Sequence, residues 1–326
     1  MRVVMAETVN AEPARFSEAA AHIRSGKLVA FGTETVYGLG GNAVDGEAVA
    51  RIFRAKGRPS FNPLISHVPE AEIAFSLGVP TALAETLASA FWPGPMTLVL
   101  GQRDNCPVSS LATSGLDSIA LRVPGSALAR AFLREVALPV AAPSANRSGR
   151  ISPTRADHVQ EELGDIADLA LILDTGACVE GLESTVIDAR GQKPVILRPG
   201  SVTAEMIRDV TGTDLENAGD DVLSPGQLTS HYAPRTPLVL NQHAPQESDA
   251  WIGFGSTEHI RAHAAFTFSE HGDLIEAAAC LYDILRQADA AGAERIAIAP
   301  IPSGGIGTAI NDRLSRAAAD TAALSD

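Results

Sequence analysis

Short apolar runs and helical repeats alternate along the first two-thirds of the chain. The apolar runs are typical of strands and occur at 27–32, 64–68, 96–100, 119–123, 139–142, 169–173, 184–188 and 195–198. Apolar residues at helical spacing predict helices at 48–55, 81–90 and 154–163, the second of which stops at Trp92-Pro93-Gly94-Pro95. This alternation predicts an α/β or α+β domain with a sizeable mixed sheet.

The pattern changes near residue 211. Residues 211–237 lack clean periodicity and are rich in Gly, Asp, Ser and Pro, so we expect a long linker there. Beyond the linker, strands are predicted at 238–240, 251–254 and 295–301, and helices at 274–290 and 307–319. The first of these helices has an apolar face made of Leu274, Ala277, Ala278, Leu281, Ile284, Leu285 and Ala288. We therefore predict a first domain at 1–210, the linker at 211–237, and a small doubly wound, Rossmann-like domain at 238–326.

The net charge of −14 is unevenly distributed along the chain. Residues 1–210 contain 19 basic and 23 acidic side chains, whereas residues 211–326 contain 6 and 16. The last third is therefore a poor candidate for binding a nucleic-acid backbone, because like charges repel. The first part is close to neutral and lacks interleaved aromatic and basic residues, which also counts against an RNA-binding surface.

The cysteines and the hydrophobic segments indicate the cellular compartment in which the protein is expected. Cys106, Cys178 and Cys280 are far apart and odd in number, which disfavours a disulfide framework and favours a reduced compartment. The start of the chain lacks the apolar core of a signal peptide. No apolar run approaches the roughly 18 residues that a membrane span needs. We expect a cytoplasmic protein without a membrane partner.

Two short polar segments carry the clearest candidate chemistry. Lys56-Gly57-Arg58 places two cations one residue apart, which suits a polyphosphate, and Ser144-Ala145-Asn146 offers a hydroxyl and an amide to the same ligand. The alternatives are solvated charges at a helix end and ordinary turn residues after a strand. The stiff loop at 59–63 and the small residues at 141–143 favour the ligand-binding interpretation for both segments.

Three further features have polar groups beside predicted strands. Residues 33–39 are expected as a loop, and the glycines that continue to Gly41 allow close backbone approach; the alternative is a glycine-rich turn that caps a strand. The segment is no P-loop, because the chain lacks that motif. His67, in an apolar run, is either a core residue or part of a site. Arg122 lies inside a predicted strand and must be paired or meet an anion, for which a substrate carboxylate or phosphate is a natural partner. Residues 183–186 and 198–200 place polar groups at two more strand ends, where open α/β sheets bind ligands.

Together these segments resemble the YrdC-like threonylcarbamoyl-AMP synthases in their two-domain form. The similar segments are 33–40, 56–64, the strand with Arg122, 143–146, 183–186, 197–200, 224–234 and 309–314. The resemblance implies a YrdC-like twisted mixed sheet with flanking helices, followed by a smaller Rossmann-like C-terminal domain. It also implies condensation of L-threonine, bicarbonate and ATP into threonylcarbamoyl-AMP and pyrophosphate, for t6A37 biosynthesis in tRNA.

The resemblance also assigns roles to individual residues. The proposed catalytic residues are Lys56, Arg58, Ser144 and Asn146. The residues implied for L-threonine are Thr35, His67, Arg122, Ala142 and Ser184. The residues implied for ATP are Arg58, Asn62, Ser118, Ser144, Ser152, Arg198, His231 and Tyr232, of which the last two belong to a linker segment lying over the site.

Other partners and alternatives follow from the same comparison. Mg²⁺ is expected to arrive with ATP, and no protein metal cluster is visible in the sequence. Downstream tRNA-modification proteins are expected partners. Direct binding of tRNA stays open. One alternative is a non-catalytic RNA-binding module. Another is a carbamoyl-adenylate-forming relative acting on a different acceptor, although the lack of zinc-finger cysteine spacing disfavours the larger hydrogenase-maturation relatives.

Overall fold

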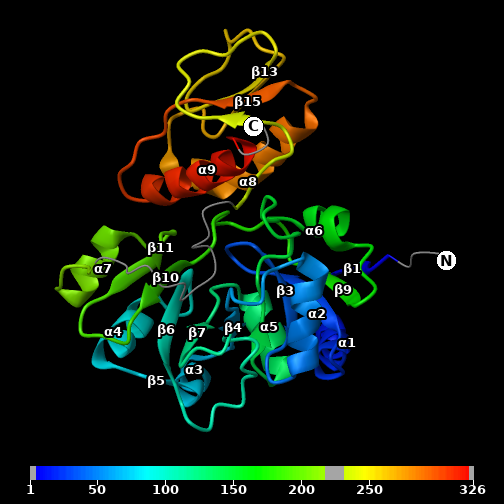
Figure 1. Ribbon diagram of the computed structural model, residues 1–326, viewed down its shortest axis with the longest axis vertical. Coiled ribbons are helices and arrows are strands. Elements are labelled where there is room, and N and C mark those ends of the chain that lie inside the picture. Colours follow the sequence, from blue (N-terminus) through cyan, green and yellow to red (C-terminus); the bar gives the residue numbers. More distant parts are fainter. Residues whose placement is uncertain (1–4, 217–230, 323–326) are drawn as a thin grey trace.

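The computed structural model describes residues 5–216 and 231–322 as two stacked lobes, a larger first domain and a smaller second domain (Figure 1). Residues 217–230, which include most of the predicted linker and residues 224–230 of its family-like segment, lie outside the described residues. The chain re-enters the described part at His231, where hydrogen bonds join it to Arg316 of the second domain and, at Ala233, to Gly149 of the first.

The first domain is built on an 11-stranded mixed sheet. Its order is β1-β9-β2-β3-β8-β4-β7-β6-β10-β11, with β5 paired to β6. The strands are β1 (Glu7–Asn10), β2 (Leu28–Gly32), β3 (Tyr37–Asn42), β4 (Ile65–His67), β5 (Gly78–Val79), β6 (Met96–Gln102), β7 (Ser118–Arg122), β8 (Val140–Ala141), β9 (Leu169–Asp174), β10 (Thr185–Asp188) and β11 (Val195–Arg198). Each of the eight apolar runs predicted in this part of the chain overlaps one of these strands.

Helices cover both faces of this sheet. They are α1 (Pro13–Arg24), α2 (Gly46–Lys56), α3 (Ala71–Leu77), α4 (Ala82–Phe91), α5 (Ala127–Val136), α6 (Ala156–Leu163) and α7 (Ala204–Thr211). In β2, Leu28 and Ala30 pack into the core that contains α2 and α6, whereas Val29 and Phe31 pack into the core that contains α1 and α5. Burial on both faces explains why β2 is a continuous apolar run rather than an alternating one.

Helices α2, α4 and α6 confirm the three helices predicted for this domain, and local capping explains their bounds. The Asp45 side chain accepts a hydrogen bond from the Glu47 amide before α2, and Gly57 ends α2 in the left-handed conformation at φ 62°. Thr81 caps α4 by accepting from the Ala84 amide. The left-handed turn at Gly57 leads the chain from Lys56 directly to Arg58.

The prediction of a loop at the glycine-containing segment is wrong from Tyr37 onward, because residues 37–42 form strand β3. The glycines serve close packing within the sheet. A Cβ atom at Gly40 would lie 2.9 Å from Phe31 Cε1, and one at Gly38 would lie 3.1 Å from the Ala142 Cβ. Strand β3 therefore passes close to the segment that precedes Ser144.

The second domain has a four-stranded parallel sheet in the order β12-β15-β13-β14. Its strands are β12 (Leu238–Val239), β13 (Asp249–Gly253), β14 (Ala264–Thr267) and β15 (Arg295–Ile298), and its helices are α8 (Leu274–Ala290) and α9 (Gly307–Ala322). The parallel sheet agrees with the predicted Rossmann-like character. The doubly wound arrangement is wrong, because in Figure 1 α8 and α9 lie side by side on the face turned toward the first domain. The connections at 240–248 and 254–263 are helix-free loops, so among the described residues no helix covers the other face.

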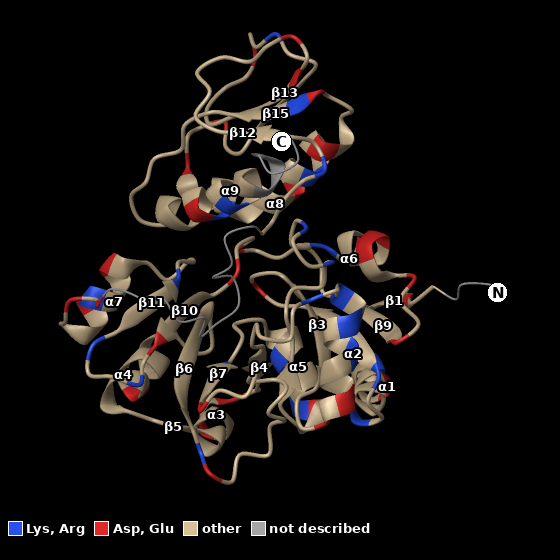
Figure 2. Ribbon diagram, viewed as in Figure 1, with Lys and Arg blue, Asp and Glu red and all other residues tan. Residues whose placement is uncertain are grey.

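The two domains share a hydrophobic cluster. Side chains of α8, α9 and the second sheet pack in one cluster with Val36, Ile151 and Leu182 of the first domain and with Tyr232. Polar contacts surround it, including a 2.6 Å hydrogen bond from Arg286 Nη2 to the Ile151 carbonyl. Figure 2 shows basic and acidic residues on α8, α9 and α6 around this interface.

No helix in the described part of the chain is long and apolar enough to cross a bilayer.

Candidate active site

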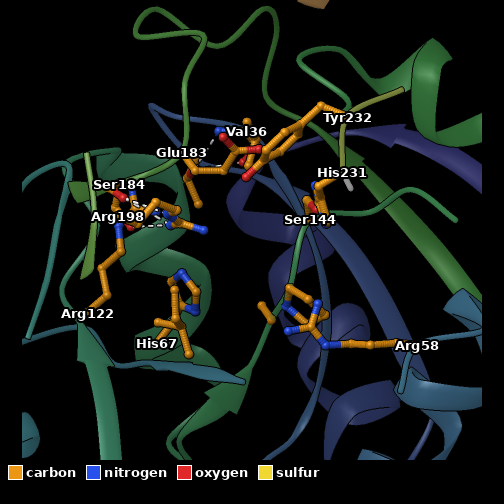
Figure 3. A pocket seen from close by; sticks show the side chains of 14 residues that line it. Val36, Arg58, His67, Arg122, Ser144, Glu183, Ser184, Arg198, His231 and Tyr232 are labelled. Carbon is orange, nitrogen blue, oxygen red and sulfur yellow. Dashed lines mark hydrogen bonds between the residues drawn. The ribbon is translucent and has the colours of Figure 1, made fainter. Parts of the chain in front are cut away.

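A pocket opens at strand ends of the first domain, with His231 and Tyr232 of the re-entering chain on one side (Figure 3). The turn after β2, the end of α2, strands β4, β7 and β8, the start of β10, the end of β11 and the re-entering chain contribute to it. Its lining residues are Thr33, Val36, Arg58, Ile65, His67, Arg122, Ala142, Pro143, Ser144, Glu183, Ser184, Arg198, His231 and Tyr232. The sheet thus gathers residues from the whole first domain at one edge.

Arg122 has a partner inside the protein that the sequence did not reveal. Its Nη2 donates to Glu34 Oε1 at 2.6 Å, and both side chains are buried. The second Glu34 oxygen accepts from the Ser126 amide at 3.1 Å. Burial opposes ionisation of Glu34, but Arg122 more than offsets it and holds the pKa of that carboxyl below its usual range. The Nε of Arg122 has no hydrogen-bond partner among the described residues, so one edge of the guanidinium remains open to a ligand.

His67 lies at the same end of the pocket. The ring is buried and packs edge-on against Phe31, with 6.3 Å between the ring centroids. Its Nδ1 has no hydrogen-bond partner among the described residues. Burial, reinforced by Arg122, lowers the pKa of His67 to about 3. A neutral imidazole with an unused polar atom in a pocket is typical of a ligand contact, because buried polar atoms are otherwise satisfied.

Arg58 and Arg198 supply positive charge to the pocket. Arg58 donates to the carbonyl oxygens of Asn62 at 3.2 Å and Pro63 at 3.1 Å, and in Figure 3 its guanidinium points toward the middle of the pocket. No carboxylate among the described residues forms an ion pair with Arg58. Burial, with the nearby Arg198 charge, lowers the pKa of Arg58 to about 10, so the group is cationic at neutral pH.

Arg198 is fixed against the start of β10. Its Nε and Nη2 donate to the Ser184 carbonyl oxygen at 3.1 and 3.0 Å, and Nη2 also donates to Ser184 Oγ at 3.1 Å. Ser184 Oγ shares a further hydrogen bond of 2.8 Å with Thr97. The predicted nucleotide residue Arg198 and the predicted threonine residue Ser184 are therefore directly joined.

The four predicted catalytic residues lie together but divide into two pairs. Arg58 and Ser144 line the pocket, whereas Lys56 and Asn146 are buried beside it. Lys56 Nζ donates to the carbonyl oxygens of Ser144 at 2.6 Å and Asn146 at 2.5 Å, and lies 3.5 Å from Asn146 Oδ1. The Asn146 amide donates to the carbonyl oxygens of Arg147 and Arg150, each at 2.8 Å. Lys56 and Asn146 therefore hold the loop that presents Ser144.

The surroundings of Lys56 are unfavourable for its charge. Burial, followed by the neighbouring Arg58, shifts the pKa of the Lys56 ammonium well below its usual range. Three oxygen atoms within hydrogen-bonding distance use all the donors of an ammonium group. The structure thus gives Lys56 a supporting position in the loop and no place in the pocket lining.

Other predicted site residues also separate into lining and supporting positions. His67, Arg122, Ala142, Ser184, Arg198, His231 and Tyr232 line the pocket. Thr35, Asn62, Ser118 and Ser152 are buried but are not among the lining residues. Thr35 bonds to Thr33, which takes the lining position in that turn, with 2.8 Å between the two hydroxyl oxygens.

Glu183 is a second carboxylate that sequence reasoning left without a role. One oxygen accepts from Ser152 Oγ at 2.6 Å, and the other accepts from Tyr282 OH at 2.8 Å and Arg313 Nε at 2.9 Å. Burial opposes its ionisation, but Arg313 and Arg198 hold the pKa of Glu183 at about 2. Two features of the sequence could have indicated this role for Glu183. One is its charge within the polar segment 183–186, and the other is the family-like segment 309–314, which contains its partner Arg313.

The re-entering chain closes one side of the pocket. The His231 amide donates to the Arg316 carbonyl of α9 at 3.4 Å, and the Ala233 amide donates to the Gly149 carbonyl at 2.7 Å. Tyr232 between them has a left-handed φ of 69°, which is uncommon for an aromatic residue. These contacts attach the segment to both domains, in agreement with the predicted position over the site.

The buried histidines predict how stability depends on pH. Burial lowers the pKa values of His67 and His231 from 6.5 to about 3. The unfolded chain therefore binds more protons than the folded chain below pH 6.5, so the free energy of unfolding falls as pH drops from about 7 toward 3. At pH 5 the expected loss is roughly 2 kcal/mol for each histidine. Depression of the Glu183 pKa adds a further loss as pH falls through about 4.5 toward 2.

Denaturant unfolding followed between pH 8 and pH 5 checks this prediction. The variant His67→Asn/His231→Asn should lose most of the slope between pH 6.5 and pH 5, where Glu183 stays ionised in both states. An unchanged slope in that variant would show that other groups control the acid sensitivity.

Fold and pocket together define a two-domain α/β protein with a cationic, largely buried site for an anionic ligand. The family profile described as "Telomere recombination" matches residues 21–200, and the profile described as "Threonylcarbamoyl-AMP synthase, C-terminal domain" matches residues 202–319. The chain is 39% identical to the threonylcarbamoyl-AMP synthase of Bacillus subtilis, over 93% of each protein. It is 38% identical to that of Pyrococcus abyssi, over 92% of each.

A solved structure agrees with these matches. The crystal structure of Pyrococcus abyssi Sua5 complexed with L-threonine superposes with a TM-score of 0.86, at 36% identity and over 98% of each chain. The chain therefore belongs to the threonylcarbamoyl-AMP synthase family, in its two-domain YrdC-like form. The family resemblance and the fold class expected from the sequence are both confirmed.

Proposed function

We propose that this protein is an L-threonylcarbamoyladenylate synthase, which converts L-threonine, bicarbonate and ATP into L-threonylcarbamoyladenylate and pyrophosphate. The observation that carries the proposal is the pocket itself, where Arg58 and Arg198 face the same space as His67 and the open edge of Arg122. Such a site suits a polyphosphate and an amino-acid carboxylate side by side. The relatives from Bacillus subtilis and Pyrococcus abyssi carry the matching name.

The reaction has two bond-forming steps. The threonine amine adds to the carbon of carbon dioxide, or to that of bicarbonate with loss of water; a C–N bond forms, the nitrogen loses a proton, and an N-carboxy anion results. A carbamate oxygen then attacks the α-phosphorus of ATP, and the bond from that phosphorus to the β-phosphate oxygen breaks as pyrophosphate leaves. The carbamate is short-lived in water, so a buried site suits this chemistry.

The residues of the pocket suit positioning and charge stabilisation. Arg122 Nε binds the threonine carboxylate, and Ser184 and His67 offer polar contacts at the same end. Arg58 and Arg198 bind the phosphates and stabilise the charge that moves to the leaving group. Lys56 and Asn146 hold the loop that presents Ser144. No step needs a covalent enzyme intermediate.

Mg²⁺ belongs to this proposal as a companion of ATP. The pocket carboxylate Glu183 and the neighbouring Glu34 are already engaged by Arg313 and by Arg122, respectively. Among the described residues no group of three or more His, Cys, Asp or Glu side chains is placed to hold a metal ion. These residues fit a cation held mainly by the phosphate oxygens, where it would neutralise charge on the leaving pyrophosphate.

The cellular setting follows from the proposed product. Threonylcarbamoyladenylate is a reactive mixed anhydride, so an acceptor-modifying partner must consume it, and t6A37 formation in tRNA is the process we propose. A cytoplasmic location fits this role. The three free cysteines, Cys106, Cys178 and Cys280, are compatible with a reducing compartment.

A pyrophosphate-release assay tests the proposal. The purified protein with Mg²⁺, ATP, bicarbonate and L-threonine should release pyrophosphate and form an adenylate with the mass of the threonylcarbamoyl product. Omission of threonine or bicarbonate should abolish both signals, and L-valine should replace threonine poorly because it lacks the hydroxyl. Release without threonine, or with a different acceptor preferred, would contradict the proposal, and RNA retention without any ATP consumption would favour the binding-module alternative.

A further inference from the structure

Arg313 is a side chain of the second domain that contacts residues lining the pocket. It belongs to α9 and is fully buried, although it is one of the largest side chains in the protein. It is not a lining residue. Its planar group instead makes contacts with three separate segments that do line the pocket.

The first segment is the start of β10. Arg313 Nε donates to Glu183 Oε2 at 2.9 Å, the same oxygen that accepts from Tyr282 OH of α8. The other Glu183 oxygen holds Ser152. Two helices of the second domain thus fix the Glu183 carboxylate, and through it a residue predicted to contact the nucleotide.

The second segment is the turn that follows β11. Arg313 Nη2 donates to the Pro199 carbonyl at 2.9 Å, directly after Arg198. This turn packs tightly against β10, because a Cβ atom at Gly200 would lie 2.5 Å from the Thr185 amide nitrogen. The bond to Pro199 therefore holds the turn that directly follows Arg198.

The third segment is the re-entering chain. The Arg313 guanidinium carbon lies 5.2 Å from the centroid of the Tyr232 ring, in a cation–π arrangement. Tyr282 stacks on the same ring at 5.7 Å with an interplanar angle of 25°. In Figure 3 Tyr232 and Glu183 lie on the same side of the pocket, above Arg198.

The contacts of Arg313 lead to three residues predicted for the nucleotide: Ser152 through Glu183, Arg198 through the adjoining Pro199 carbonyl, and Tyr232 directly. Its third nitrogen, Nη1, donates to Asp312 Oδ2 at 2.6 Å, which orients the guanidinium from within α9. The threonine side, with His67 and the Arg122–Glu34 pair, has no hydrogen bond or ion pair to Arg313. We propose that Arg313 is a positioning residue of the ATP half of the active site, so that the second domain completes the nucleotide site without touching the nucleotide.

This inference rests on the proposed function for its kinetic test. The variant Arg313→Met keeps the bulk of the side chain and removes its charge and its donors. We expect the KM for ATP to rise by about tenfold or more, while the KM for threonine stays within about threefold. Arg313→Lys restores one charged contact to Glu183 and should recover part of the ATP effect.

A matched control separates positioning from domain stability. Arg295 also pairs with a fully buried carboxylate of the second domain, Asp249, at 2.6 and 3.1 Å, but within the sheet and away from the pocket. Arg295→Met should lower the melting temperature while both KM values stay within about threefold of wild type. If Arg313→Met and Arg295→Met gave the same kinetic pattern, Arg313 would be an ordinary structural residue and the proposal would fail.

A readout independent of catalysis distinguishes this proposal from the proposed function. Hydrogen exchange of peptides covering 183–186 and 197–202 should be faster in Arg313→Met than in wild type and in Arg295→Met. If wild-type protein formed no adenylate, the proposed function would be wrong. The exchange rates would still show whether Arg313 orders the two segments. If Arg313→Met did not fold, Arg313→Lys would be used for both the kinetic and the exchange measurements. An ATP KM and exchange rates in Arg313→Lys equal to those of wild type would then overturn the proposal.

Discussion

Replacement of Arg58 by methionine should reduce kcat/KM for ATP by about 10²–10³-fold while the protein stays folded. Arg58 is a buried cation of the pocket that no described carboxylate neutralises, and its own hydrogen bonds go to the carbonyls of Asn62 and Pro63. Its charge is therefore available to phosphate oxygens. Removal of a single charged donor aimed at a transition state commonly has an effect of this size.

Steady-state pyrophosphate release measures the effect of Arg58→Met, with thermal unfolding as the check on folding. Arg54→Met is the matched control, because Arg54 lies one turn earlier on α2, is 66% exposed and pairs with Asp168 at the surface. The control should keep kcat/KM within about twofold of wild type. Near-normal activity in Arg58→Met would remove Arg58 from the site.

Replacement of Lys56 by methionine should abolish activity and also destabilise the protein, which sets it apart from Arg58→Met. The Lys56 ammonium is fully buried and satisfies the carbonyl oxygens of Ser144 and Asn146. Each buried oxygen left without a donor costs about 1–3 kcal/mol. The loop should relax, and Ser144 should leave its position in the pocket.

Denaturant unfolding and pyrophosphate release, measured together, check the Lys56 prediction. Asn146→Ala breaks the same loop from the other side, so the double variant should be less destabilised than the sum of the two single variants. A Lys56→Met protein with wild-type stability but no activity would contradict the supporting role. That result would instead favour a direct contact between Lys56 and the phosphates, as the paired-cation motif alone suggests.

The sequence predicted most of the first sheet because its buried strands are continuous apolar runs. It predicted α8 at the residues observed, since the apolar face of that helix repeats regularly over 17 residues. It failed at β3, where the glycines of 38–41 indicate a turn but serve close packing between strands. The short helices α3 and α7 have few buried residues, so their periodicity is weak.

The sequence predicted the residues that line the site better than it predicted the residues with which they form ion pairs. Arg58, His67 and Arg122, which the sequence analysis selected from separate segments, line one pocket, and the strand ends of β4 and β7 bring the last two together at one edge of the sheet. The pairing of Arg122 with Glu34 joins residues 88 positions apart, and that of Arg313 with Glu183 joins residues 130 apart. No local pattern indicates such pairs, so the carboxylates that neutralise the pocket became visible only in the fold.

The hydrophobic cluster between the domains has a consequence for how the whole chain behaves as a folding unit. Val36, Ile151 and Leu182 come from loops of the first domain, yet their apolar surface is covered by the helices of the second. Separation of the two domains, by proteolysis or by truncation of the gene, would expose that surface to water on both fragments. The protein therefore has two lobes, but the shared cluster couples their stabilities. The two domains should unfold in a single cooperative transition.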